Sequence, residues 1–463
     1  MRALTVACAL ALSAAALAGP TDLLWRSDAA AMAAGGSYAP PAVLGETRPD
    51  FPTSLADAGA GIVAAEVSVR EPLTLRRGRR EFGEITGETR VTRMALPVAE
   101  GWHAGWSISD DTLRTSHRLR TATTRAEIDT RDLCVGAAWS DGPWTLGVAE
   151  CDRDLRARAS GSTIADLQGV AEGAEGITLS LGGAADTLGV QYASGGWLAG
   201  VRYSERDADA RLPVEIDGSS YAGVFSGTER HFDAWLIAER GRERWFAYLA
   251  DVSADPGPGA LFAGTAVRGR LSLGADSTAI GVGRRRAWPG GGSHLELSRH
   301  DDSADLSGHL NRGALGGGLT GQDTVVADAR LRTWAVRWTE EHSAGLWHYR
   351  WGATAMVCDL DFEGRHVGVP GPLQAPDARW ERRLEGGGAW LAAAILGGGR
   401  EVSGWRIDGT LALLTGDTFG DIIDPAAPET PAPAQVTPEP EPTGPGMRLD
   451  LGWLFSLRAT LDL

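Results

Sequence analysis

The chain has 463 residues, of which 62 are glycine and 17 are tryptophan, and its formal net charge is −16. Such an acidic chain is not expected to bind nucleic acid, because phosphates need a basic surface. Outside the N-terminus the sequence has no run of about 18 apolar residues, so a bundle of membrane helices is excluded.

Residues 1–18 have the three parts of a secretory signal peptide. Arg2 supplies the basic part, residues 4–17 the apolar run, and residues 16–18 the small-x-small cleavage motif. Cys8 lies in the apolar run without the surroundings of a lipoprotein signal. An N-terminal membrane anchor is the alternative. We expect export, which permits disulfides.

Residues 19–60 are rich in Ala, Gly and Pro and show no strand alternation. Thr21 could cap a short helix over residues 22–34 that ends at Gly35-Gly36. We expect an irregular segment that acts as a solvated linker; a segment tucked into the following domain is the alternative.

From about residue 61 the sequence alternates apolar and polar residues with period two, as strands do. The clearest hairpin spans residues 132–152, with Gly142-Pro143 as its turn. This register places Trp139 opposite Leu146 and Cys134 opposite Cys151. Cross-strand Cβ atoms lie about 4.5–5.5 Å apart, close to the disulfide range. We therefore predict a disulfide between Cys134 and Cys151.

An internal repeat predicts two further hairpins. Leu-Ser-Leu-Gly at 179–182 precedes Leu-Gly-Val at 188–190, and the same four residues at 271–274 precede Ile-Gly-Val at 280–282. We expect turns at 184–185 and 276–277. Repeated hairpins are typical of an up-and-down barrel. The uneven turn spacing argues against a propeller, whose blades recur every 40–50 residues or so.

Three more hairpins are predicted, around residues 241–242, 342–343 and 397–399. The second is the most aromatic and places Trp338 opposite Trp347. Six large residues on one of its faces suit a membrane interface, where Trp and Tyr are enriched. Longer polar stretches, expected to be loops, separate the hairpins. They are residues 152–176, 205–229, 253–264, 299–323, 363–385 and the Pro-rich 415–446.

The last strand carries the most specific pattern. Residues 447–463 alternate for longer than the usual 5–6 residues or so of a soluble strand. Within them Asp450, Gly452, Phe455 and Leu457 fit polar-x-Gly-x-x-aromatic-x-hydrophobic. The pattern resembles the C-terminal assembly signal of bacterial outer-membrane β-barrels, although six residues follow Leu457 here.

This resemblance implies an all-β fold, a transmembrane antiparallel up-and-down barrel over residues 61–463 with roughly 14–16 strands. It implies an outer-membrane location, contact with outer-membrane lipid and recognition by the barrel-assembly machinery. Residues 19–60 would then lie in the periplasm, and the 415–446 stretch would be extracellular. The sequence does not decide whether the protein forms a homo-oligomer, because no strongly apolar outer patch can be identified in it.

Polar positions of the strands at 265–288 and 330–358 predict a pore lining. In the expected registers Arg268 faces Arg285 and Arg337 faces His348. These arginines would form a positive wall, with Glu205, Asp207, Asp209, Asp301, Asp302 and Asp305 as an acidic loop opposite. The arrangement resembles the eyelet of general porins and suits small polar solutes. A lumen filled by Arg–carboxylate pairs is the alternative. The predicted pore-lining residues are Arg268, Arg270, Arg285, Arg337, His348 and Arg350.

The sequence contains no catalytic or cofactor motif: no P-loop, no Cys-x-x-Cys and no dinucleotide fingerprint. His300, Asp301, Asp302, Asp305 and His309 form a cluster that we interpret as a solvated loop. We therefore expect no enzyme activity, metal or cofactor. Cys358 is expected inside the barrel as an inert thiol.

Three functions remain open from the sequence. The first is a porin-like channel for passive passage of polar solutes. The second is a closed structural or adhesive barrel whose loops contact surface partners. The third is a secreted β-propeller that binds glycan.

Overall fold

The computed structural model describes most of the chain outside the N-terminus and several connections. The described residues are 31, 33–34, 36–59, 61–77, 80–119, 122–161, 177–216, 219–255, 258–263, 266–312, 321–369, 380–419 and 448–463. The expected signal peptide at 1–18 lies outside them, as does nearly all of the Pro-rich 415–446 stretch.

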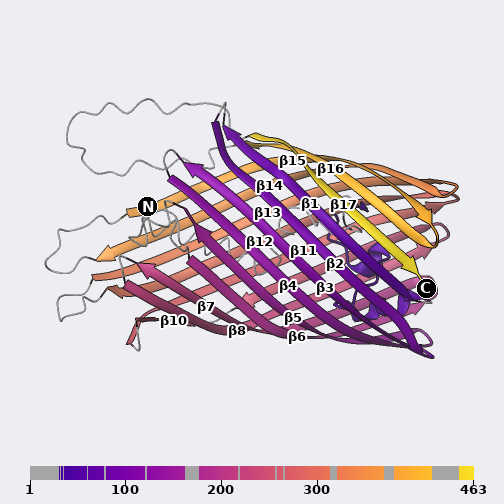
Figure 1. Ribbon diagram of the computed structural model, residues 1–463, viewed down its shortest axis with the longest axis horizontal. Coiled ribbons are helices and arrows are strands. Elements are labelled where there is room, and N and C mark those ends of the chain that lie inside the picture. The colour runs from indigo at the N-terminus through magenta and orange to yellow at the C-terminus, as the bar shows by residue number, and fades with distance from the viewer. Residues whose placement is uncertain are drawn as a thin grey trace.

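Seventeen strands form one antiparallel sheet that closes on itself (Figure 1). The strands are β1 (Ile62–Arg77), β2 (Arg80–Ala99), β3 (Trp102–Leu119), β4 (Ala122–Asp141), β5 (Trp144–Ser160), β6 (Ile177–Ser194), β7 (Trp197–Ile216), β8 (Ser219–Arg240), β9 (Glu243–Asp255), β10 (Pro258–Ala263), β11 (Ala266–Trp288), β12 (Gly291–Arg312), β13 (Gly321–Ala344), β14 (Trp347–Val369), β15 (Trp380–Val402), β16 (Trp405–Phe419) and β17 (Arg448–Asp462).

The closed sheet is a 16-strand barrel. Strands β9 and β10 both pair with β8 on one side and with β11 on the other, so they share one place in the wall. Strand β1 pairs with β17 as well as β2, which closes the barrel. The predicted antiparallel barrel is confirmed. The propeller alternative is wrong, because its blades would be separate sheets.

The strands turn most of their large apolar side chains outward, unlike strands in a soluble protein. On β5, Trp144, Leu146 and Val148 are exposed, whereas Ala149 on the other face is buried. Exposed apolar side chains recur around the wall and form an apolar belt. Its members include Trp102, Val135, Val201, Leu236, Trp245, Val282, Leu297, Trp334, Val336, Tyr349, Leu396 and Leu457. An outward apolar belt with aromatic residues is the surface of a transmembrane barrel.

The strands are much longer than a membrane crossing needs. Strand β13 has 24 residues, whereas about 9–11 suffice to cross. Beyond the belt, outward positions carry ion pairs such as Arg114–Glu127 at 2.6 Å and Arg330–Asp328 at 3.3 Å. The stretches 205–229 and 299–323 were expected to be loops but are mostly strand. Their polar side chains suit a barrel wall that extends beyond the membrane into water.

Short turns connect the strands at one end of the barrel. The turns at residues 142–143 and 241–242 are confirmed, and Gly142 and Gly241 have φ values of 55° and 65°. These left-handed conformations cost glycine nothing. The aromatic hairpin turns at 345–346 instead of 342–343. Because the slip preserves alternation, Trp338 still points outward, but it pairs with Ala353 rather than Trp347.

Three predicted turns are wrong. Residues 184–185, 276–277 and 397–399 lie inside the unbroken strands β6, β11 and β15. Their small residues instead make room on the inner face of the wall. A Cβ on Gly183 would lie 1.8 Å from the backbone oxygen of Asp207, so only glycine fits there.

Residues 36–59 lie inside the barrel, and we call this segment the plug. It contains the helix α3 (Pro41–Leu44) and the 3-10 helix η2 (Pro52–Ala58). In Figure 1 its coiled segments lie within the barrel near the C-terminus, at the end with the short turns. Most of its side chains are buried, so the expected solvated linker is wrong for these residues. No helix in the described part of the chain is long and apolar enough to cross a membrane.

Candidate functional site

Prolines and glycine set the shape of the plug. Pro41 and Pro52 stand at the starts of α3 and η2, where the missing N–H costs no hydrogen bond. Gly45 ends α3 with a φ of 71°. Helices this short are not stable alone, so contacts with the barrel wall must hold them.

Glycines in the wall make the space for the plug. A Cβ on Gly147 would lie 2.7 Å from the carbonyl carbon of Pro52, and one on Gly136 would lie 2.8 Å from the oxygen of Pro49. Gly147 pairs with Gly189 on the next strand. Both glycines lie in a Leu-Gly-Val sequence, at 146–148 and 188–190, and these two copies mark the wall behind the plug.

Apolar contacts hold one side of the plug. Val43 and Leu44 pack against Trp235, Phe246 and Tyr248, which point inward from β8 and β9. These aromatic residues are buried. The plug thereby forms a small apolar core with the wall at this end; a separate apolar cluster that includes Met356, Ile395 and Leu454 lines the inner face of β14, β15 and β17.

Glu46 is the first charged anchor of the plug. Its carboxylate accepts a hydrogen bond from Arg93 on β2 and lies 3.6 Å from Arg458 on β17. The Glu46 side chain is 1% exposed. Breaking a buried ion pair by removing one partner typically costs about 3–5 kcal/mol. This contact therefore ties the plug to the strands that close the barrel.

Glu296 on β12 is the second anchor. It accepts hydrogen bonds from Ser37 of the plug, from Tyr248 at 2.9 Å and from Arg337 at 3.0 Å. The guanidinium of Arg337 also lies 5.3 Å from the ring centre of Tyr38. Arg337 is thereby engaged by a carboxylate and by the plug.

Asp50 is the third anchor and the one at the cavity. Its carboxylate accepts two hydrogen bonds from Arg48, at 3.0 and 2.8 Å, and lies 3.9 Å from Arg202 on β7. Arg202 also donates to the backbone oxygen of Asp50 and to Asp233. Burial alone would raise the pKa of Asp50, but Arg48 and Arg202 lower it to about 2.

A polar cavity of about 310 Å³ lies above the plug. Its floor includes Tyr38, Asp50 and Phe51 of the plug, and the disulfide forms part of its wall. Charged and hydroxyl side chains dominate the remaining surface. They include Glu66, Arg93, Asp111, Asp132, Arg153, Thr187, Arg202, Ser204, Arg206, His231, Asp233, Ser277, His300 and Asp302. Such a lining suits polar solutes and water.

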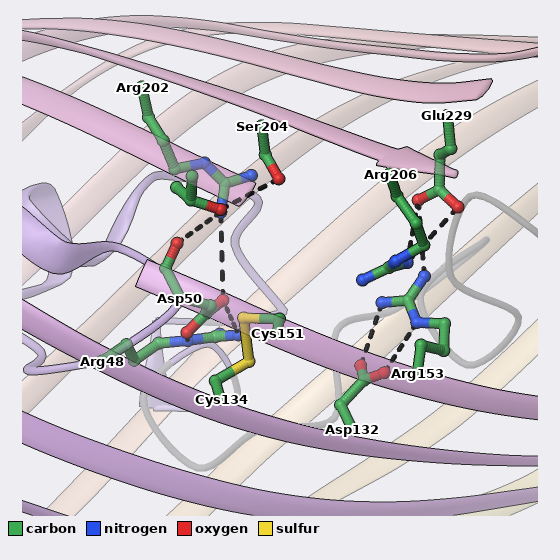
Figure 2. The surroundings of a disulfide bond; sticks show 11 residues. Arg48, Asp50, Asp132, Cys134, Cys151, Arg153, Arg202, Ser204, Arg206 and Glu229 are labelled. Carbon is green, nitrogen blue, oxygen red and sulfur yellow. Dashed lines mark hydrogen bonds and ion pairs between the residues drawn. A yellow bond between two sulfur atoms is a disulfide. The ribbon is translucent and has the colours of Figure 1, made fainter. Parts of the chain in front are cut away.

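A chain of ion pairs crosses four strands at this cavity (Figure 2). Arg153 donates to both carboxylate oxygens of Asp132, at 2.7 and 2.9 Å. Arg153 also lies 3.5 Å from Glu229, which accepts from Arg206 at 3.4 Å. His231 contacts Glu229 as well. Acids and bases therefore alternate across this part of the wall.

Four of the six predicted pore-lining residues face the lumen. Arg337 and His348 are buried, Arg285 donates to the oxygen of Val43 at 2.8 Å, and Arg350 donates to Glu341. Their inward direction follows from alternation, which the shifted turn does not change.

The predicted positive wall is wrong. Arg270 is exposed and shares its phase on β11 with the outward Ile280 and Val282. Arg268 has the same phase on the strand, although its side chain lies outside the described residues. The error comes from the turn predicted at 276–277, which would have reversed the phase.

Carboxylates on strands, rather than an acidic loop, neutralise the inward basic residues. His348 contacts Asp408, and Arg406 bridges Asp408 at 2.9 Å and Glu341 at 3.1 Å. The residues of the supposed acidic loop lie on β7 and β12. Glu205, for instance, points outward and lies 3.8 Å from Arg230.

Cys134 and Cys151 form a disulfide on the lumen side, in the register expected from the sequence. Figure 2 shows the bond next to Arg48 and Asp50 of the plug. Cys358 is a buried free thiol that accepts a hydrogen bond from Thr333 at 3.5 Å.

The histidine and aspartate cluster lies on β12 rather than in a loop. His300 contacts Ser277 at 2.8 Å and Asp302 at 3.2 Å through the same atom, Nε2. A catalytic triad needs the serine and the carboxylate on opposite ring nitrogens, so this arrangement is not a triad. Among the described residues no group of three or more His, Cys, Asp or Glu side chains could hold a metal ion.

The sequence interpretation missed the residues that matter most at this cavity. Arg202, Arg206 and Glu229 fall in or next to a stretch expected to be a loop. Alternation over residues 201–206 was the available signal, because Val201 and Tyr203 point outward and Arg202, Ser204 and Arg206 share the other face.

No protein-family model matches this sequence, and no curated protein matches it. Solved structures give similarities of fold. The Pseudomonas putida toluene transporter TodX has 11% identity and a TM-score of 0.42, covering 93% of this chain and 96% of its own. A Pseudomonas aeruginosa FadL homologue has 12% identity and a TM-score of 0.42, covering 94% and 98%. The Ralstonia pickettii toluene transporter TbuX has 9% identity and a TM-score of 0.40, covering 93% and 97%. At these values the solute, if any, that this barrel handles does not follow from theirs.

Proposed function

We propose that this protein is an outer-membrane channel for small polar solutes, held closed at its turn end by the plug. The observation that carries the proposal is the polar cavity of about 310 Å³ between the barrel wall and the plug. The apolar belt supports a location in the membrane, and the turn end would face the periplasm, where such barrels have short turns.

The plug makes two kinds of contact, and their balance favours a movable closure. Its apolar packing lies in two separate small patches, one of Val43 and Leu44 against β8 and β9 and one of Leu55 against Ala95 and Ala138. Elsewhere charged contacts with the wall hold it, at Glu46, Asp50 and Ser37. Water entering the cavity can replace such polar contacts one by one, whereas a continuous apolar core would be lost as a unit.

A closed structural barrel is the second candidate function. The ion pairs that link neighbouring parts of the wall, from Asp132 through Arg153 to Glu229, favour it. In that case the plug and the ion pairs would serve stability alone, and the long strands would present the loops at the cell surface.

A reversible crosslink between plug and wall tests the channel. The Thr53 Cγ2 atom lies 2.9 Å from the position of a Cβ on Gly189, so Thr53→Cys with Gly189→Cys should bring two sulfurs within disulfide reach. Proteoliposomes carrying this variant should swell in arabinose when reduced and stop swelling when oxidised. The unmodified protein under the same redox conditions is the control, because it contains its own disulfide.

Equal swelling in the oxidised and reduced states would contradict the gating role of the plug. No swelling of either state, with the protein folded, would favour the closed structural barrel.

A further inference from the structure

Two arginines come together on the inner wall because the strand between them carries almost no side chain. Arg153 on β5 pairs in register with Gly183 on β6, and the next inward residue of β6, Ala185, pairs with Arg206 on β7. A Cβ on Gly183 would lie 3.3 Å from Cγ of Arg206. The two guanidinium groups therefore meet across β6, as Figure 2 shows.

Arg206 is only partly satisfied. Within the described residues its side chain makes two hydrogen bonds of 3.4 Å, both from Nη1, to the two oxygens of Glu229. Its Nε is buried and has no hydrogen-bond partner among the described residues. The residue is 5% exposed and lines the cavity. A buried N–H without a partner is unfavourable, and an incoming acceptor would relieve that cost.

A hydroxyl in the wall of the same cavity is also unsatisfied. Thr130 on β4 lines the same cavity, is 7% exposed, and its Oγ1 has no partner in the described part of the chain. It lies two residues from Asp132, the partner of Arg153. A hydroxyl can donate to an anion that the arginines hold.

We propose that Arg206, with Arg153 and Thr130, forms a binding subsite for a carboxylate group inside the lumen. The Nε and Nη2 edge of a guanidinium matches the two oxygens of a carboxylate and binds them side by side. The contacts to Glu229 are at the long end of the hydrogen-bond range, so the guanidinium can turn that edge toward the cavity.

The charges around the subsite favour a monoanion. Asp132 and Glu229 formally neutralise Arg153 and Arg206, so a bound carboxylate adds one negative charge and a phosphate dianion adds two. His231, which contacts Glu229, compensates for one charge when it is protonated. The solutes that this assignment favours are small organic acids and amino acids. The solute class rests on the proposed function, whereas binding to the folded barrel does not.

Thermal unfolding of the detergent-folded barrel in sodium acetate tests the subsite. Acetate should raise the unfolding midpoint saturably relative to sodium chloride at the same ionic strength, because a ligand that binds only the folded state stabilises it. Arg206→Gln should weaken the apparent acetate affinity at least about tenfold. Thr130→Val, which keeps every charge, should weaken it by a smaller factor. Arg211→Gln, an exposed position on the same strand, should change nothing.

Three results would overturn the proposal: no saturable effect of acetate, the same effect in Arg206→Gln, or an equal effect of inorganic phosphate at pH 8. If acetate binds as expected but arabinose never enters the proteoliposomes, the subsite stands and the channel function fails. If arabinose enters but Arg206→Gln leaves acetate binding unchanged, the channel stands and the subsite fails.

Discussion

At the scale of single residues, charge inside the barrel is almost always paired. Asp50 lies between Arg48 and Arg202, and Glu46 lies between Arg93 and Arg458. A carboxylate in a polar lumen costs little when its partners are fixed beforehand by a rigid sheet. Arg48 belongs to the plug, but Arg202, Arg93 and Arg458 are presented by the wall and dock the plug.

Acid should release the plug through Asp50. The pKa of this carboxyl is about 2 when docked, against an ordinary value of 3.8. Arg48 stays with Asp50 when the plug leaves, so only the part of this shift that Arg202 supplies favours docking, and the charged form favours docking by less than about 2 kcal/mol. Because the docked pKa is depressed, this contribution is complete above pH 3.8 and is lost as the pH falls toward 2. Protease cleavage of the plug should rise over that window, and Asp50→Asn should raise it already at pH 7.

Asp57 provides the matched control within the same plug. This residue is exposed, so Asp57→Asn should leave plug docking at pH 7 unchanged. Equal loosening by Asp50→Asn and Asp57→Asn would contradict the role of the Asp50 ion pairs.

The Cys134–Cys151 disulfide should protect both thiols from alkylation. After unfolding without reductant, only Cys358 of the three cysteines after the predicted signal peptide should react with a maleimide, and all three should react after reduction. Closing a loop of about this length is worth roughly 3 kcal/mol, so reduction should also lower the unfolding temperature. Labelling of Cys134 or Cys151 without reductant would contradict the presence of the disulfide.

At the scale of strands, the outward face explains why the sequence predicted a barrel. Alternation survives any error in turn position that moves a strand by an even number of residues. The aromatic hairpin shows this, because its turn was misplaced while Trp338 and Tyr349 still point outward. The turns predicted at 184–185 and 276–277 were wrong because small residues occur both in turns and on strands where the lumen is crowded. Only the neighbouring strands distinguish these two cases.

The closing strand β17 should not tolerate a charge at its lipid-facing centre. Leu457 is exposed on the outer face and pairs with Val67 of β1. Leu457→Arg should cost about 2–4 kcal/mol at the bilayer midplane and lower the amount of heat-modifiable folded barrel. Leu463→Arg is the control, since charge near the interface costs about 0–1 kcal/mol. Normal membrane levels of Leu457→Arg would contradict the closing role of this strand.

At the scale of the whole molecule, the plug is the part that the sequence could not predict. It lacks periodicity, and its partners lie far away in the chain, as Ser37 and Glu296 illustrate. Local sequence patterns describe a strand and its neighbours, whereas docking of the plug depends on how all sixteen strand positions of the barrel wall are arranged in three dimensions. The lumen-facing glycines such as Gly136 and Gly147 were visible in the sequence, but their purpose appears only with the plug beside them.

The closure of the barrel by the plug is tested most directly by single-channel conductance in a planar bilayer. The full chain should be closed most of the time, because the plug fills the turn end. Gly136→Ala with Gly147→Ala should give long-lived open steps, since each added methyl group collides with the plug. Gly182→Ala, whose nearest contact is an ordinary 3.4 Å, should behave like the full chain. Long-lived open steps of equal size in the full chain and in the double variant would contradict closure by the plug.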